Sequence, residues 1–183
     1  MPEARLEQTE KGLQPATEGW FVVNVRDTAW RNHRGAFGSA CRLESREVPF
    51  QQLGINIRVL EPGQPNCLYH RENLQEDFLV LHGECALLVD EQERPLKAWD
   101  FVHLPPETDH VVVGAGDGPC VILMAGARSD DEELFYPVSE LAQRYGASAE
   151  EGTPSPEVAY ARFDPPTQER PPSWDSLPWV RGT

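Results

Sequence analysis

The sequence lacks long apolar runs, paired cysteines and an excess of basic residues, and each lack excludes a class of protein. Its most apolar stretch, residues 121–125, is far shorter than the ~20 residues of a membrane-spanning helix. The four cysteines, Cys41, Cys67, Cys85 and Cys120, form no CxxC pair, which favours free buried thiols. The formal net charge is −14, so neither nucleic acid nor an anionic membrane is expected as a partner.

The chain has 183 residues, of which 39% are hydrophobic. This is enough for one domain with a modest core. Residues 1–19 are polar and acidic and lack the basic start and apolar centre of a signal peptide. We therefore expect a cytoplasmic protein with a loose N-terminal segment, 1–19. The predicted β-barrel occupies residues 20–128, and a C-terminal extension occupies 129–183.

The central part of the chain consists of short β-type runs separated by turns rich in Gly, Pro and Asp. The expected strands are 20–25, 39–43, 55–60, 67–72, 76–82, 84–90, 94–97, 100–104, 109–114 and 119–127, and residues 27–38 are expected to form an irregular loop. No helical periodicity occurs between residues 54 and 127. This pattern predicts an all-β sandwich or barrel.

The C-terminal extension has a different character. Residues 137–145 suggest a short helix that ends at Gly146, and Ser155 and Pro156 could begin another that ends near Arg162. A proline-rich tail follows from residue 164 and contains two tryptophans. Because a disordered tail seldom keeps two tryptophans, we expect it to pack on its own barrel or on a partner subunit. The extensions at both ends favour a homodimer, with edge coverage within one chain as the alternative.

Residues 63–110 gather the side chains that could carry chemistry. His70, Glu72 and Glu76 lie within one short segment, and His110 follows a Leu-Pro-Pro turn. On an extended chain, His70 and Glu72 point to the same face because strand side chains alternate. Two imidazoles and two carboxylates that converge in a small β structure would bind a first-row metal. The alternatives are hydrogen-bonded core histidines and, for Glu76, a carboxylate at a strand edge.

Residues 60–125 resemble the cupin superfamily. The first cupin motif, G-x5-H-x-H-x3–4-E-x6-G, is matched by His70-x-Glu72-x3-Glu76-x6-Gly83, with a glutamate in place of the second histidine. The second motif, G-x5-P-x-G-x2-H-x3-N, is matched in spacing from Trp99 to Gly114, although only Pro105 and His110 keep their identity and both motif glycines are replaced.

This resemblance implies a double-stranded β-helix, a jelly-roll barrel, in which His70, Glu72, Glu76 and His110 share one divalent metal. Two glutamates inside a barrel also need a cation or full hydrogen bonding. The donor set favours Mn²⁺ or Fe²⁺, with Zn²⁺ and Ni²⁺ also possible. Glu72 could instead orient His70 or a bound water from outside the ligand set.

The orientation of several neighbours of the motif follows from strand alternation or from the turns beside them. On a regular strand Cys67 would face away from His70, and Asp77 would point out of the barrel. His103 could line the cavity or lie outside it. Trp99 is expected to pack rather than to stack on a substrate.

Two functions from different classes fit this chain. The first is a metal-dependent cupin enzyme, a dioxygenase, isomerase or lyase, that acts on a small polar metabolite. The second is a non-catalytic metal- or ligand-binding protein such as a sensor, although no DNA-binding domain is evident. The His70-x-Glu72…His110 spacing also resembles 2-oxoglutarate oxygenases, for which Arg128 is the basic residue nearby. No Lys/Arg cluster is visible near the motifs, which argues against a sugar-phosphate isomerase.

Overall fold

The computed structural model describes residues 1–10 and 12–179. The strands are β1 (Leu6–Thr9), β2 (Gly12–Pro15), β3 (Ala29–Arg31), β4 (Ser39–Arg42), β5 (Leu53–Leu60), β6 (Arg71–Glu72), β7 (Glu76–His82), β8 (Glu84–Val89), β9 (Gln92–Lys97), β10 (Phe101–Leu104), β11 (His110–Ala115), β12 (Cys120–Ala127) and β13 (Leu134–Phe135). The helices are α1 (Glu140–Gln143), α2 (Pro156–Ala159) and the 3-10 turn η1 (Trp174–Ser176).

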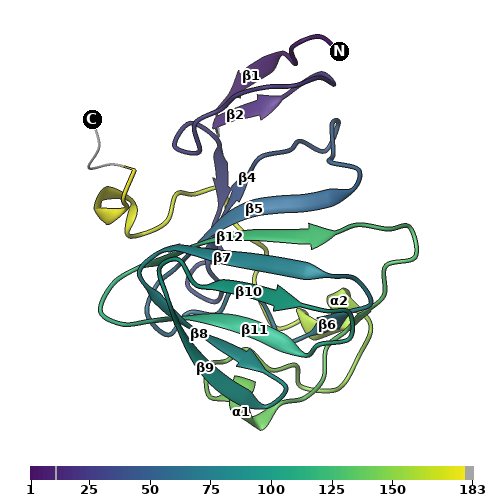
Figure 1. Cartoon of the computed structure of the whole chain (residues 1–183), viewed down its shortest axis with the longest axis vertical. Coiled ribbons are helices and arrows are strands. Elements are labelled where there is room, and N and C mark those ends of the chain that lie inside the picture. The colour runs from purple at the N-terminus through teal and green to yellow at the C-terminus, as the bar shows by residue number, and fades with distance from the viewer. Residues whose placement is uncertain (11, 180–183) are drawn as a thin grey trace.

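Two sheets enclose the main core (Figure 1), and the pairs β1-β2 and β13-β6 form two small sheets beside them. A six-stranded sheet has the order β10-β7-β12-β5-β4-β3, and a three-stranded sheet has the order β11-β8-β9. Phe78 and Ile122 from the larger sheet pack against Leu87 and Val112 from the smaller one. Their alternation along each strand buries one face of each sheet. The expected all-β jelly-roll barrel, the double-stranded β-helix, is confirmed.

Two turns keep the backbone shape of the motif although their glycines are replaced. Trp99 has φ 75° and Glu107 has φ 66°, both in the left-handed region that costs an L-residue about 1–2 kcal/mol. At Trp99 this turn leaves the indole 76% exposed. The expectation that Trp99 packs against the protein is therefore wrong.

The N-terminal third differs most from expectation. β1 and β2 form a hairpin within residues 1–19, which were expected to be loose. The division of the chain into three parts stays a prediction. Residues 21–24 form no strand, whereas β3 lies inside the expected loop and pairs with β4. Strand formation here depends on an available partner, which local sequence does not reveal.

Both predicted helices are present, although shorter than expected. In α1 the Ser139 hydroxyl accepts a hydrogen bond from the backbone N–H of Ala142 at 3.0 Å, and Gly146 ends the segment with φ 69°. No helix among the described residues is long and apolar enough to cross a membrane.

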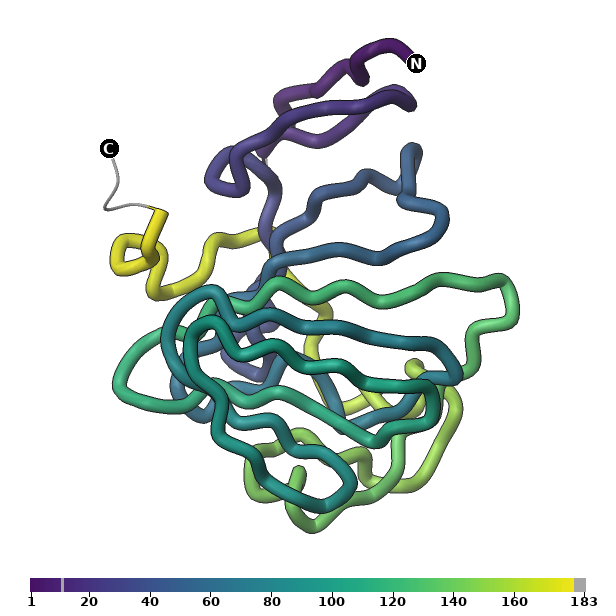
Figure 2. Tube along the Cα trace, viewed as in Figure 1, coloured from purple at the N-terminus to yellow at the C-terminus, as the bar shows by residue number. Residues whose placement is uncertain are grey.

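The C-terminal tail packs on its own barrel, as one of the two expectations states. Its trace returns from the α1–α2 end of the molecule toward β4 and β5 (Figure 2). The rings of Trp174 and Trp179 lie 5.7 and 5.8 Å from that of Trp30 on β3. Leu177 is fully buried in the same cluster. The tail thereby covers the outer face of β3 to β5.

Candidate metal centre

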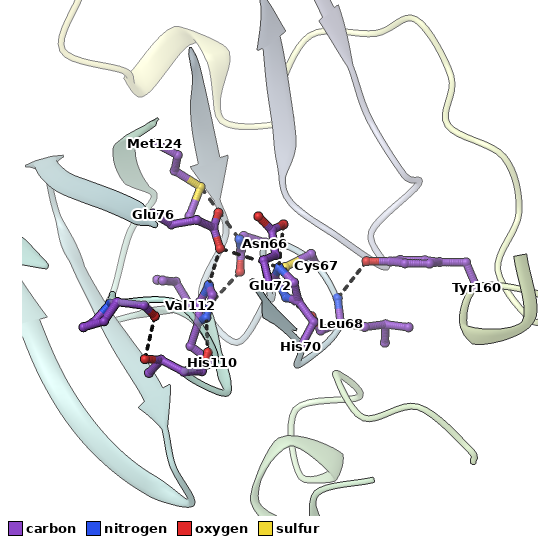
Figure 3. A network of polar contacts seen from close by, with 12 residues as sticks. Asn66, Cys67, Leu68, His70, Glu72, Glu76, His110, Val112, Met124 and Tyr160 are labelled. Atoms are coloured by element: carbon purple, nitrogen blue, oxygen red, sulfur yellow. Dashed lines mark hydrogen bonds and ion pairs between the residues drawn. The ribbon is translucent and has the colours of Figure 1, made fainter. Parts of the chain in front are cut away.

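Direct backbone pairing brings the two motif histidines together. The backbone N–H of His70 donates to the His110 carbonyl at 3.1 Å, and that of His110 donates to the His70 carbonyl at 2.8 Å. Paired residues of antiparallel strands place their side chains on the same face. The two ring centroids consequently lie 4.8 Å apart (Figure 3).

Backbone carbonyls fix the tautomer of both imidazoles. Nδ1 of His70 lies 2.9 Å from the Leu68 carbonyl oxygen, and Nδ1 of His110 lies 3.0 Å from that of Thr108. Because a carbonyl oxygen can only accept, each Nδ1 carries the proton. In the neutral rings, each Nε2 then presents its lone pair to the site, as in many metal-binding histidines.

Glu76, at the start of β7, completes a cluster that could hold a metal ion. Its Oε2 lies 3.0 Å from Nε2 of His110 and 3.7 Å from Nε2 of His70. The ligand atoms of these three residues lie within 4.8 Å of one another. Because metal–ligand bonds of about 2.0–2.2 Å let two ligand atoms on one ion lie up to about 4.4 Å apart, both Glu76–histidine distances are compatible with a shared ion.

Two of these atoms have unmet bonding capacity. Among the described residues, Oε2 of Glu76 and Nε2 of His110 are buried and have no hydrogen bond of acceptable geometry. Buried polar atoms of this kind are uncommon in folded proteins and call for an unseen partner. A divalent cation between them would satisfy both, so the residues present fit the group that the cupin resemblance implies.

The site favours a negative carboxylate and a positive His70. Burial alone would raise the pKa of Glu76, but the His110 imidazole and the charge of His70 outweigh it and lower that pKa. For His70, burial opposes the charge, whereas the Cys67 sulfur and the two carboxylates raise its pKa well above the ordinary range. Metal binding would have to displace this proton, so the affinity should fall in acid.

Glu72 lies at the edge of this cluster. The strand pair β6–β13 holds its backbone, and its Oε1 lies 3.5 Å from Nε2 of His70. It is not part of the three-residue cluster. The geometry allows Glu72 to act as a fourth ligand or to hold a water beside the ion, and its role as a ligand stays a prediction.

The cluster opens into a cavity of about 240 Å³. Cys67 lines it, with Sγ 3.6 Å from Nδ1 of His70. Parity suggested that Cys67 faces away, but residues 67–69 form no strand, so the alternation rule does not apply. Two aromatics from the C-terminal extension complete this wall, Tyr136 stacked 5.9 Å from His70 and Tyr160 hydrogen-bonded to the Leu68 N–H at 3.0 Å. Neither tyrosine was predicted from the sequence, because both follow the motifs by more than 20 residues.

The opposite wall of the cavity comes from β5 and β12. It includes Asn56, Arg58 and Met124. Arg58 was not identified from the sequence, because its strand precedes both motifs. Arg128 also lines the cavity, but its guanidinium is paired with Glu44 at 2.6 and 2.8 Å, which weakens the 2-oxoglutarate alternative that depends on it.

His103 lies outside the cavity. Its Nδ1 contacts Oδ1 of Asp77 at 2.7 Å, and its side chain is half exposed. Asp77 points out of the barrel as parity predicts, because it alternates with Glu76 and Phe78 on β7. This pair marks the outer face of the six-stranded sheet.

Comparisons with known proteins agree with this geometry. The family model described as a cupin domain matches residues 56–126, which includes all four predicted ligands. A search of curated proteins gives no match. The part of the chain formed by residues 56–126 is therefore assigned to the cupin superfamily.

Two of the similar solved structures are described as sugar phosphate isomerases. A candidate sugar phosphate isomerase from Acidithiobacillus ferrooxidans is 28% identical, with a TM-score of 0.51 over 56% of this chain and 67% of that one. A cupin sugar phosphate isomerase from Silicibacter pomeroyi is 25% identical, with a TM-score of 0.57 over 65% of this chain and 82% of that one.

An RmlC-like cupin from Shewanella frigidimarina is 17% identical, with a TM-score of 0.50 over 60% of this chain and 91% of that one. At this identity the likeness concerns the fold alone.

Proposed function

We propose that this protein is a metal-dependent cupin enzyme that acts on a small polar metabolite. One divalent ion is bound by His70, Glu76 and His110, with Glu72 as a fourth ligand. The observation that carries the proposal is the buried pair of Glu76 Oε2 and His110 Nε2, which face each other without a hydrogen bond. A histidine–carboxylate set of this kind favours Mn²⁺ or Fe²⁺ over softer ions, with Zn²⁺ and Ni²⁺ still possible.

The metal would supply Lewis-acid polarisation of a carbonyl or hydroxyl oxygen. Of the three expected reaction classes, isomerisation has the most support, because two similar structures are described as sugar phosphate isomerases. A dioxygenase or lyase remains compatible with the same ligands.

Isomerisation needs a residue that moves a proton, and Glu132 is the candidate. It lines the cavity and belongs to the acidic run of residues 130–133. Burial and the charge of Glu72 raise the pKa of its carboxyl above the ordinary value. A carboxyl whose pKa moves toward neutrality is better suited to general acid–base catalysis. Tyr136 and Tyr160 are less suitable because burial raises their pKa values.

Non-catalytic ligand or metal binding is the second candidate. This function is favoured by the exposure of Glu132. An exposed side chain on a loop is held less firmly than a catalytic group on a strand. Substitution separates the two functions. If the protein is an enzyme, Glu132→Gln should lower kcat and leave the metal content unchanged. The adjacent Glu133→Gln should change neither kcat nor the metal content.

The proposal is tested by metal analysis of protein purified without chelators. We expect close to one equivalent of metal in the wild type and a large loss in His70→Ala. The same preparations should be assayed with a panel of sugar phosphates, and with small acids and phenols for oxygen uptake. Sub-stoichiometric wild-type metal would reject the site, and a fully loaded protein that is inactive on every substrate would favour the binding function.

The remaining expectations on partners also stay proposals. A homodimer is supported by the outer face of β10, where Phe101 is 64% exposed beside the exposed Trp99. A small molecule remains the expected ligand, and neither nucleic acid nor membrane is expected as a partner. The cytoplasm remains the expected location.

A further inference from the structure

Three arginines gather on the concave face of the larger sheet. β3, β4 and β5 align Arg31, Ala40 and Arg58 in one cross-strand row. Arg42 lies two residues after Ala40 on β4, so it shares this face. The outer face of the same strands carries Trp30, Cys41 and Val59 under the C-terminal tail, so the arginines point toward the barrel side.

These three arginines, Arg31, Arg42 and Arg58, form no ion pair among the described residues, although the charge of Arg42 lowers the pKa of Glu44 and that of Arg58 lowers the pKa of Glu76. Within residues 1–10 and 12–179, no carboxylate lies within 4.0 Å of their guanidinium nitrogens; every ion pair involves another residue. Arg58 donates only to neutral acceptors, Asn56 Oδ1 at 3.2 Å and the Asn66 carbonyl at 3.3 Å. Nε of Arg31 is buried without a hydrogen bond. In a chain of net charge −14, acidic partners are abundant, so their lack here is a local property.

The surroundings show that these charges repel one another. Burial lowers the pKa of Arg31, and the positive charges of Arg42 and Arg58 lower it further. Arg128, at the rim, is neutralised by Glu44. A polyvalent anion would relieve the repulsion and could accept hydrogen bonds from several guanidinium groups at once.

The arginines line a cavity of about 140 Å³, several times the ~30 Å³ that a water molecule occupies in the liquid. Gly54, Asn56 and Arg58 line both this cavity and the one at the metal cluster. Gly126 is paired with Gly54 on β5 and with Glu76 on β7. A Cβ on Gly54 would meet the Arg128 guanidinium at 3.0 Å, and one on Gly126 would meet the Glu76 side chain at 3.6 Å, so the two glycines let these side chains lie against the sheet between the two cavities. β4, β5, β12 and β7 lie side by side in Figure 1.

We propose that Arg31, Arg42 and Arg58 form a subsite for the phosphate group of a phosphorylated small-molecule substrate, whose other end reaches the His70–Glu76–His110 cluster. The phosphate subsite itself does not depend on the proposed function. Only the claim that the bound substrate reaches the metal cluster rests on it. It also revises the expectation that basic residues are missing near the motifs. They come from strands that precede both motifs, and they meet only through the register of the sheet.

The test uses inorganic phosphate as the probe and the full chain freed of metal by a chelator, with binding measured by calorimetry at constant ionic strength. We expect saturable binding that Arg31→Gln and Arg58→Gln each weaken about 10-fold or more, since each substitution removes charge-assisted hydrogen bonds to the anion. Arg94→Gln, on the exposed strand β9, should change it less than about 2-fold. Succinate should bind more weakly than phosphate.

Thermal unfolding checks that the variants fold. Arg31→Gln removes one of three repelling charges, so the Tm of the phosphate-free protein should stay level or rise. Equal phosphate affinity in the wild type and the arginine variants, or tighter binding of succinate, would overturn the assignment.

Metal content separates this proposal from the proposed function. The arginine variants should keep wild-type metal content. Metal-free His110→Ala should still bind phosphate. If phosphate binds only in the presence of metal and the arginine substitutions do not change its affinity, the subsite proposal is overturned, whereas the proposed metal centre is not.

Discussion

Replacing Glu76 by glutamine removes the carboxylate on which the proposed metal centre depends. The two side chains have nearly the same shape, and Glu76 Oε2 lies 3.0 Å from His110 Nε2 and 3.7 Å from His70 Nε2. The variant should therefore keep the fold of β7 but lose the one negative charge placed between both imidazoles. Its stabilisation by added Mn²⁺ should largely disappear.

The size of the effect follows from linkage between binding and folding. At 100 times its Kd, Mn²⁺ stabilises the wild type by about 2.7 kcal/mol. Loss of an outer partner of a metal ligand weakens binding by roughly 10–100-fold, so loss of a charged ligand should cost at least about 100-fold. At the same concentration, the variant would gain only about 0.4 kcal/mol. For a chain of this length, the corresponding rises in Tm are about 5–11 °C and 1–2 °C.

The assay is thermal unfolding followed by circular dichroism across a Mn²⁺ titration. Asp77→Asn is a matched control, because Asp77 is the next residue on β7 and faces outward against His103. It should respond to Mn²⁺ like the wild type. A Glu76→Gln protein that is stabilised as strongly as the wild type would refute the assigned ligand role of Glu76.

Three further predictions concern the tail, the pH response and assembly. Leu177→Ala should destabilise the protein by about 2–5 kcal/mol in denaturant unfolding, because the side chain is fully buried; a cost no larger than that of the exposed Val22→Ala would remove the tail's structural role. The Arg128 hydrogen bond lowers the pKa of Glu44 despite its burial. This ion pair therefore stabilises the folded protein above the unfolded-state pKa of about 4.3, and its contribution is lost as pH falls through the lower folded-state pKa. Between about pH 5 and 3, the urea midpoint of Arg128→Gln should therefore decline less steeply than that of the wild type. Equal slopes would contradict this. Phe101→Asp should convert a dimer to a monomer in light scattering, and a monomeric wild type would reject the dimer.

The sequence predicts the strands best where side chains alternate and glycine turns bound them. Strand β7 matches the expected 76–82, and the strands from β8 to β12 agree within a few residues. The hairpin β1–β2 and strand β3 were not predicted because they depend on partners elsewhere in the chain. Conversely, the apolar run after Gly19 makes only an isolated bridge between Trp20 and Glu3 among the described residues, and residues 21–24 form no strand.

The site was predictable where chemistry and spacing coincide in one segment. His70, Glu76 and His110 follow the cupin motif, and the structure brings their ligand atoms together. Cys67 was placed on the wrong side because it precedes the strand whose alternation was assumed. The row of arginines could not be predicted from any single segment of the sequence, because Arg31 and Arg58 are brought together only by the intervening strand β4.

The most direct test of the central claim is anomalous diffraction from crystals of the full chain grown with Mn²⁺. The account predicts one dominant anomalous peak within about 2.0–2.3 Å of Nε2 of His70, Nε2 of His110 and an oxygen of Glu76. Loss of this peak in Glu76→Gln crystals grown in the same way would strengthen the assignment. An empty cluster in wild-type crystals, or a dominant peak bound by other residues, would contradict it.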